Sequence, residues 1–224
     1  GIKSENVTPG GVGIDLDAFK QSDTNEIPDE IKEIQHIKAD IKLLYIGRIE
    51  ERRNIPFLFD ILNELKNRNV NAKLVMIGNG DEEYCKNCFD YAKKYGVFDS
   101  IYHIKKAEQK YLQYAYKNAD IFLLPTRYEI FGMVLLEAMY FGTPAITTKN
   151  GGSQMLIENG IDGYIIDVFN KSLWCDKIIE ASQNSAKISQ NAHKKITEKF
   201  TWDVLSDKFI STYEKKINNE NSTC

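Results

Sequence analysis

Short apolar runs alternate with amphipathic segments along most of the chain. The apolar runs predict six strands, at Lys42–Ile46, Lys73–Ile77, Ser100–Ile104, Asp120–Leu124, Pro144–Thr147 and Tyr164–Asp167. Helical spacing is found at Ile55–Arg68, Glu82–Tyr95, Glu108–Lys117, Phe131–Phe141, Gln154–Glu158, Leu173–Gln183 and Trp202–Ile217. Strands that alternate with helices predict an α/β fold, a doubly wound parallel sheet covered on both faces.

This pattern divides the chain into three parts. Residues 1–40 form an entry segment, in which the polar stretch Ser22–Asp40 predicts a loop and a surface helix. Residues 41–200 form the Rossmann-like domain, and residues 201–224 form a C-terminal helix and tail. The start, Gly1-Ile2-Lys3, is neither an initiator methionine nor a signal peptide, so we expect another segment to precede it.

Composition excludes several classes of protein. The net charge of −3 does not suggest a nucleic-acid binder, and no apolar run is long enough to predict a membrane span. The four cysteines are too scattered for a disulfide scaffold (Cys85, Cys88, Cys175 and Cys224). Cys85 and Cys88 have zinc-knuckle spacing, but no second pair follows them, so we interpret them as core-facing helix positions in a reducing cytoplasm.

Ligands of open parallel sheets bind beyond the carboxyl ends of the strands. Three segments reach that edge: Gly47-Arg48, Gly78-Asn79-Gly80 and Pro125–Met133. The second opens like a dinucleotide fingerprint, but its third glycine position is Glu83, which would repel a pyrophosphate. We therefore reject a nicotinamide enzyme and interpret this segment as a tight turn with Asp81 as helix cap.

The segment after the first strand offers cationic side chains. Arg48 follows the turning glycine Gly47, and a guanidinium there could grip phosphate oxygens. Arg53 would reach the same point if the loop folds back. The alternative is an ordinary solvated loop.

The third segment carries the strongest signal. We expect a helix to begin near Phe131-Gly132, so that the free N–H groups of Gly132, Met133 and Val134 form an anion site. Glu129 precedes this helix and Glu137 lies within it, and carboxylates are good acceptors for vicinal sugar or ribose hydroxyls. Apolar neighbours surround Glu137, which would need a partner if it is buried. The alternative is a helix with one buried and one exposed glutamate.

These residues resemble a known family. Glu129 through Glu137 match the E-x7-E signature, with its internal Phe-Gly, of the retaining GT-B glycosyltransferases of family 4. The blocks VTPGGVGIDLDAF, LLYIGRIEERRNI and LVMIGNGDEE also resemble the family, as does the stretch from NADIFLLPT to DGYII. The resemblance covers essentially the whole chain, which would then be the C-terminal, donor-binding domain.

The resemblance implies a role for each matching residue. Arg48 and Arg53 would hold the donor diphosphate, although the family carries lysine at position 53. Glu129 would lie beside the sugar hydroxyls as the catalytic-site glutamate, and Glu137 would take the ribose hydroxyls. The backbone of Phe131, Gly132, Met133 and Val134 would lie under the sugar and β-phosphate. Ile130 replaces a frequent glycine, which would alter the sugar pocket.

The resemblance also implies partners and a missing half. A nucleoside diphosphate sugar is the co-substrate, and no cofactor or metal is expected. The N-terminal domain would supply the site for a glycan or lipid-linked acceptor, so this fragment alone should be inactive. We expect a cytoplasmic protein of polysaccharide biosynthesis, with peripheral association at the inner membrane face as a further expectation.

Several alternatives stay open at this point. A non-catalytic nucleotide-sugar sensor would retain the same donor residues, and a sugar-nucleotide epimerase would share the fold. Asp15 and Asp17 form a D-x-D, the metal motif of another glycosyltransferase fold, but no suitable strand precedes them. Of the three histidines, His103 is the candidate for lining a base pocket, and His193 falls in a C-terminal helix.

Overall fold

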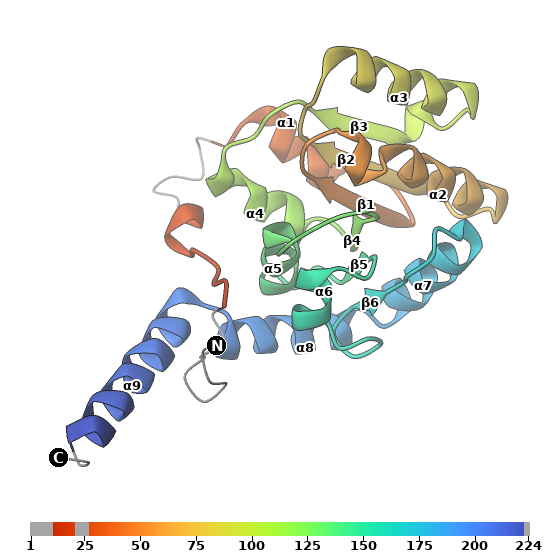
Figure 1. The fold of residues 1–224 in the computed structure, drawn as a ribbon. Helices are drawn as coiled ribbons and strands as arrows, with labels where there is room; N and C mark the ends of the chain where they lie inside the picture. Colours follow the sequence, from red (N-terminus) through yellow and green to blue (C-terminus); the bar gives the residue numbers. More distant parts are fainter. Residues whose placement is uncertain (1–10, 21–26, 222–224) are drawn as a thin grey trace.

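The computed structural model describes residues 11–20 and 27–221 (Figure 1). Six parallel strands form one sheet in the order β3-β2-β1-β4-β5-β6. Their bounds are Ile41–Ile46 (β1), Ala72–Ile77 (β2), Ile101–Ile104 (β3), Ile121–Leu124 (β4), Ala145–Thr147 (β5) and Tyr164–Ile165 (β6). The strand order reverses between β1 and β4, which makes their carboxyl ends the switch point where ligands of such sheets bind.

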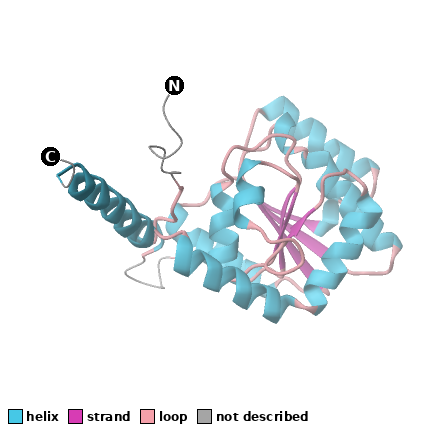
Figure 2. Cartoon of the chain, turned by 60° about the horizontal axis from the view of Figure 1, so that its bottom comes forward, coloured by secondary structure: helices cyan, strands magenta, loops and turns pink. Residues whose placement is uncertain are grey.

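Helices cover both faces of this sheet, as Figure 2 shows. One layer holds α2 (Ile55–Asn67), α3 (Glu82–Lys94) and α7 (Lys171–Gln183), in which α2 packs on both of the others. The other layer holds α1 (Asp29–Lys32), α4 (Gln109–Lys117), α5 (Met133–Tyr140) and α6 (Gly151–Leu156). Helix α8 (Ser185–Lys199) packs on α5, and α9 (Trp202–Asn221) extends away from the body (Figure 1). The predicted α/β fold with a doubly wound parallel sheet is therefore confirmed.

Four short 3-10 helices complete the described elements. They are η2 (Asp17–Phe19), η4 (Glu33–His36), η5 (Glu51–Arg53) and η6 (Phe98–Ser100). The entry segment packs into the main core, because Ile14, Phe19, Ile31 and Ile34 are all buried in the same apolar cluster as the strands. None of the described helices is long and apolar enough to cross a membrane.

Several predicted boundaries differ from the structure. Helix α5 begins at Met133 rather than at Phe131, because Gly132 adopts a left-handed conformation with φ of 66° that a helix cannot continue. Helix α6 begins at Gly151 instead of Gln154, where Asn150 and Ser153 form a reciprocal cap. Strand β6 ends at Ile165, two residues earlier than predicted.

Two further regions were incompletely predicted. Helix α8 was not set out as a separate element, although Ile188, Ala192 and Ile196 recur every fourth residue and are buried. The helix expected within Ser22–Asp40 is not confined to the surface, because α1 and η4 each bury an isoleucine. Residues 21–26 of that stretch lie outside the described part of the chain.

Candidate functional site

The loops that follow β1 and β2 are joined through their backbones. The amide of Gly47 donates to Ile77 over 3.0 Å, and that of Ile49 donates to the carbonyl of Asn79 over 2.9 Å. A Cβ on Gly80 would lie 1.8 Å from the Ile49 carbonyl oxygen, so only glycine permits this approach. Asp81 then caps α3 by accepting the Tyr84 amide at 2.9 Å, as predicted.

Arg48 lies exposed at this edge of the sheet, directly after β1. The hydroxyl of buried Tyr45 donates to the Arg48 carbonyl over 2.6 Å, which fixes the backbone beneath the guanidinium. Burial raises the pKa of Tyr45, so its hydroxyl remains a proton donor. A cavity of about 390 Å³ opens here between the ends of β1, β2 and β3, and Lys105 and Lys106 also line it. The site therefore has a cationic wall.

Arg53 folds back, as the sequence suggested, and meets Glu129. Its Nη1 donates to the Glu129 carboxylate, and the two side chains are only 15% and 12% exposed. The Ile130 amide donates to the other carboxylate oxygen over 3.0 Å. Two predicted site residues that are 76 positions apart in sequence are thus in direct contact.

The surroundings of Glu129 keep its carboxylate charged. Burial acts to raise the pKa of Glu129, but the Arg53 guanidinium and the amides of Ile130 and Gly132 outweigh it, and the pKa lies below its ordinary value. Glu129 is therefore an anion at neutral pH, held by the Arg53 guanidinium and by the backbone amide of Ile130.

The loop that carries Glu129 is fixed on two sides. On one side, the Arg127 amide donates to the carbonyl of Arg52, in η5, over 2.7 Å. On the other, the start of α6 approaches so closely that a Cβ on Gly152 would lie 1.8 Å from the Phe131 carbonyl oxygen. This arrangement explains why glycines 151 and 152 follow β5, a signal that sequence reasoning missed.

Helix α5 begins at the end of this loop. The amides of Met133 and Val134, in its first turn, have no backbone acceptor among the described residues. Ile130 and Phe131 expose 56% and 47% of their surface beside them. The structure thus places the predicted anion-binding amides at the sheet edge, next to Glu129.

Glu137 points to the other side of α5, toward α4. Its carboxylate accepts hydrogen bonds of 2.7 Å from the Tyr116 hydroxyl and of 2.7 Å from the Gln109 side-chain amide. Only 6% of the residue is exposed, and this burial raises the pKa of Glu137 although both partners oppose the rise. The expectation that a buried Glu137 needs a partner is confirmed. The two glutamates share no hydrogen-bond partner, and sequence reasoning named neither Tyr116 nor Gln109.

The other candidates lie outside this arrangement. His103 Nε2 donates to the Gly78 carbonyl over 2.8 Å and so braces the loop after β2. Asp17 begins η2 and forms an ion pair with Lys20, and no group of three metal-ligating side chains occurs within the described residues. Cys85 and Cys88 lie buried on α3, as predicted, while Cys224 falls outside the described residues.

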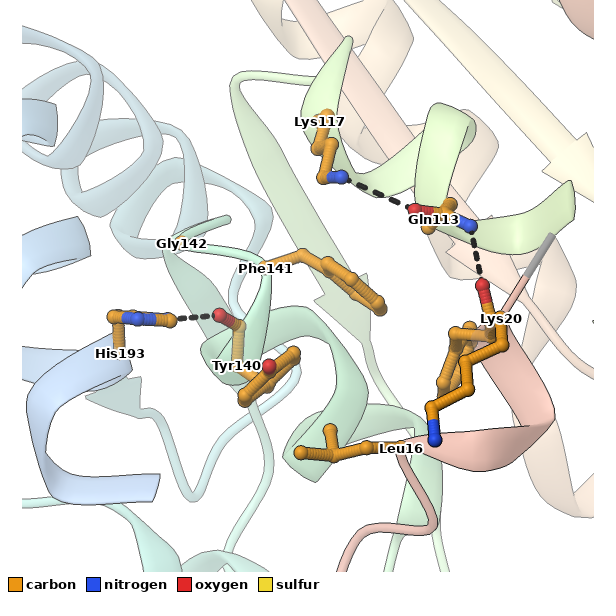
Figure 3. Close-up of a pocket in the computed structure, with 9 residues that line it drawn as sticks. Leu16, Lys20, Gln113, Lys117, Tyr140, Phe141, Gly142 and His193 are labelled. Carbon is orange, nitrogen blue, oxygen red and sulfur yellow. Dashed lines mark hydrogen bonds between the residues drawn. The ribbon is translucent and has the colours of Figure 1, made fainter. Parts of the chain in front are cut away.

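A second cavity of about 430 Å³ lies at the opposite end of α5, around Tyr140, Phe141 and Gly142 (Figure 3). Figure 3 shows the Phe141 ring facing the cavity, with Lys117 and Gln113 of α4 on one side and His193 of α8 on the other. Because α5 begins at Met133 beside Glu129 and ends here, this cavity is separate from the candidate site.

Comparison with known proteins identifies the family. The model of the family described as glycosyl transferases group 1 matches residues 26–199, which is most of the chain. The chain belongs to this family. It is 30% identical over 176 residues to an uncharacterized glycosyltransferase of Methanocaldococcus jannaschii, a match that covers 77% of this chain and 44% of the relative.

Solved structures agree on the fold. Sucrose-phosphate synthase of Thermosynechococcus elongatus superposes with a TM-score of 0.76 at 20% identity, over 93% of this chain and 52% of that protein. The Anabaena protein HepE in complex with UDP-glucose gives a TM-score of 0.74 at 20% identity, over 91% of this chain and 56% of that one. The fold is that of a GT-B glycosyltransferase domain, and the chain spans about half the length of the relatives it matches.

Proposed function

We propose that this chain is the donor-binding half of a retaining glycosyltransferase, which moves a hexose-type sugar from a nucleoside diphosphate to a glycan or lipid-linked acceptor. The observation that carries the proposal is the contact of Arg53 with Glu129 in the loop that leads into α5. A cation, free amides and a carboxylate suit a diphosphate that is joined to a polyhydroxylated sugar.

The proposed donor runs across the carboxyl edge of the sheet. Its nucleoside would enter the cavity beside Arg48, and Glu137 would accept the ribose hydroxyls after exchanging one of its present partners. The diphosphate would take the guanidinium groups of Arg48 and Arg53 and the amides of Met133 and Val134. These donors would also stabilise the charge that develops on the departing diphosphate, without a metal ion.

Glu129 is the proposed catalytic-site carboxylate. It would orient the donor sugar through its hydroxyls, while Ile130 and Phe131 would shape the wall of the sugar pocket. This assignment does not require Glu129 to be a nucleophile, because retention can also proceed by attack on the same face. The acceptor site belongs to the proposed N-terminal half, so we expect no transfer by this domain alone.

Ligand binding tests the proposal directly. The HepE complex makes UDP and UDP-glucose the first ligands to screen, followed by the other nucleoside diphosphates and their sugars. A domain that binds one of these conjugates will show a higher melting temperature in its presence. If no nucleoside diphosphate or conjugate raises the melting temperature at millimolar concentration, the donor-binding proposal is wrong.

A further inference from the structure

The anion site beside α5 is occupied from within the chain. The Glu129 carboxylate accepts hydrogen bonds from the Arg53 guanidinium and, at 3.0 Å, from the Ile130 amide. A guanidinium and backbone amides at a helix start are the groups that bind a phosphate. Glu129 therefore stands where the negative charge of a ligand would be neutralised.

Arg53 keeps capacity for another partner. Its Nε is buried and has no hydrogen-bond partner among the described residues, although Glu50 lies 3.6 Å away. The same oxygen of Glu50 already accepts the Nε of Arg52 at 2.7 Å. A ligand anion that reached Arg53 would therefore gain a hydrogen bond that Glu129 does not make, because this buried Nε has no partner among the described residues.

We propose that Glu129 is an internal competitor of the donor diphosphate. In the free protein its carboxylate neutralises Arg53 and accepts the amide of Ile130, in the loop that precedes α5. A bound diphosphate takes over Arg53, and the released carboxylate turns to the hydroxyls of the donor sugar. This inference rests on the proposed function and adds to it a means by which the site distinguishes the intact donor from the nucleoside diphosphate product.

The exchange has different costs for donor and product. An intact donor replaces the lost contacts of Glu129 with sugar hydroxyls, so the displaced carboxylate regains hydrogen bonds. A nucleoside diphosphate without sugar offers no such replacement, and Glu129 competes to recover Arg53. The contact between Glu129 and Arg53 therefore weakens binding of the nucleoside diphosphate product relative to the donor, which favours product release after transfer.

Calorimetric titration of the Glu129→Gln variant with UDP and UDP-glucose tests the competition. Loss of the carboxylate charge should tighten UDP binding about tenfold, the effect of one charge-assisted hydrogen bond. The preference for UDP-glucose over UDP should fall with it. Glu51→Gln is the matched control, because Glu51 is exposed in the neighbouring η5 turn, and it should change both affinities less than twofold. Unchanged or weaker UDP binding by Glu129→Gln would overturn the inference.

Hydrogen exchange in the absence of ligand tests the same contact independently. The amide of Ile130 should exchange faster in Glu129→Gln and in Glu129→Ala than in the wild type, and not in Glu51→Gln. Unaltered exchange in both Glu129 variants would contradict the internal contact, whatever the ligand data show. Failure of the wild type to bind UDP or UDP-glucose would instead count against a UDP-sugar donor, and the exchange rates would still decide on the contact.

Discussion

The Tyr116 hydroxyl donates a buried hydrogen bond of 2.7 Å to one oxygen of the Glu137 carboxylate, and the Gln109 side-chain amide donates one of 2.7 Å to the other oxygen. Both partners come from α4, so this contact joins α4 to α5 beneath the sheet edge. A carboxylate there is well paired, yet its burial still raises its pKa. Ionisation of Glu137 at this buried place therefore has a cost that a neutral side chain would not have.

We expect Glu137→Gln to stabilise the domain and to weaken nucleotide binding. Because the native pKa of Glu137 is raised above 4.5, the native state holds its proton more tightly than the unfolded state. The free energy of unfolding of the wild type therefore falls as the pH rises from about 4.5, the ordinary pKa of a glutamate, through the raised native pKa. Thermal unfolding at pH 4 and pH 8 should show a gain for the variant that is larger at pH 8.

In this variant the amide oxygen can accept from Gln109 while the amide nitrogen donates to the Tyr116 hydroxyl, whose own proton has the Val134 carbonyl at 3.5 Å as its remaining acceptor. Glu83→Gln, on the exposed surface of α3, serves as control and should show no such pH dependence. A Glu137→Gln protein that is less stable than the wild type at pH 8 would contradict this account.

Arg48→Gln should weaken UDP binding about tenfold and leave the melting temperature unchanged, because the guanidinium is exposed and forms no hydrogen bond or ion pair with another described residue. Lys86→Gln, an equal loss of charge on the exposed side of α3, should leave the affinity unaltered. Titration at two salt concentrations adds a check, since the salt dependence of binding should be smaller in Arg48→Gln than in the wild type.

Gly80→Ala should cost about 2 kcal/mol or more in the free energy of unfolding, because its methyl group would lie 1.8 Å from the Ile49 carbonyl oxygen. Gly160→Ala provides the comparison: its φ is 80°, but no atom lies within 4 Å of the added Cβ. Backbone strain alone should cost about 1 kcal/mol there. Chemical denaturation measures both, and equal costs would refute the role of backbone contact at Gly80.

We expect nucleoside diphosphate binding to be independent of divalent metal. Arg48, Arg53 and the start of α5 provide the positive charge, and the described residues contain no group of three metal-ligating side chains. Titration of UDP with and without a chelator measures this. A loss of affinity of more than tenfold on chelation would disprove the expectation and return attention to Asp15 and Asp17.

Sequence periodicity was sufficient for the sheet and for most helices, because apolar runs bounded by glycine leave few alternatives. It failed where a single backbone angle decides the outcome, as at Gly132, whose left-handed conformation delays the start of α5. It also misplaced the start of α6, which depends on a reciprocal cap between Asn150 and Ser153 rather than on apolar spacing. Such local interactions do not appear in a hydrophobic pattern.

The candidate site was predictable as a set of residues but not as a set of contacts. Strand order brings Arg48, Arg53 and Glu129 to one edge, and this follows from the alternating fold. The pairing of Arg53 with Glu129 depends on how two loops fold against each other, and no spacing rule encodes that. The partners of Glu137 were missed for the same reason, since Tyr116 and Gln109 belong to another helix.

The glycine contacts of the loops restrict how the specificity of this site can be redesigned. Because Gly80 touches Ile49 and Gly152 touches Phe131 without room for one carbon atom, an inserted residue in any of these loops would displace its neighbour as well. Exchanging whole loops with another transferase would therefore fail unless both touching loops are moved together. Single replacements at outward-facing positions, such as Ile130, avoid this obstacle and offer the shorter route to a change in the proposed sugar pocket.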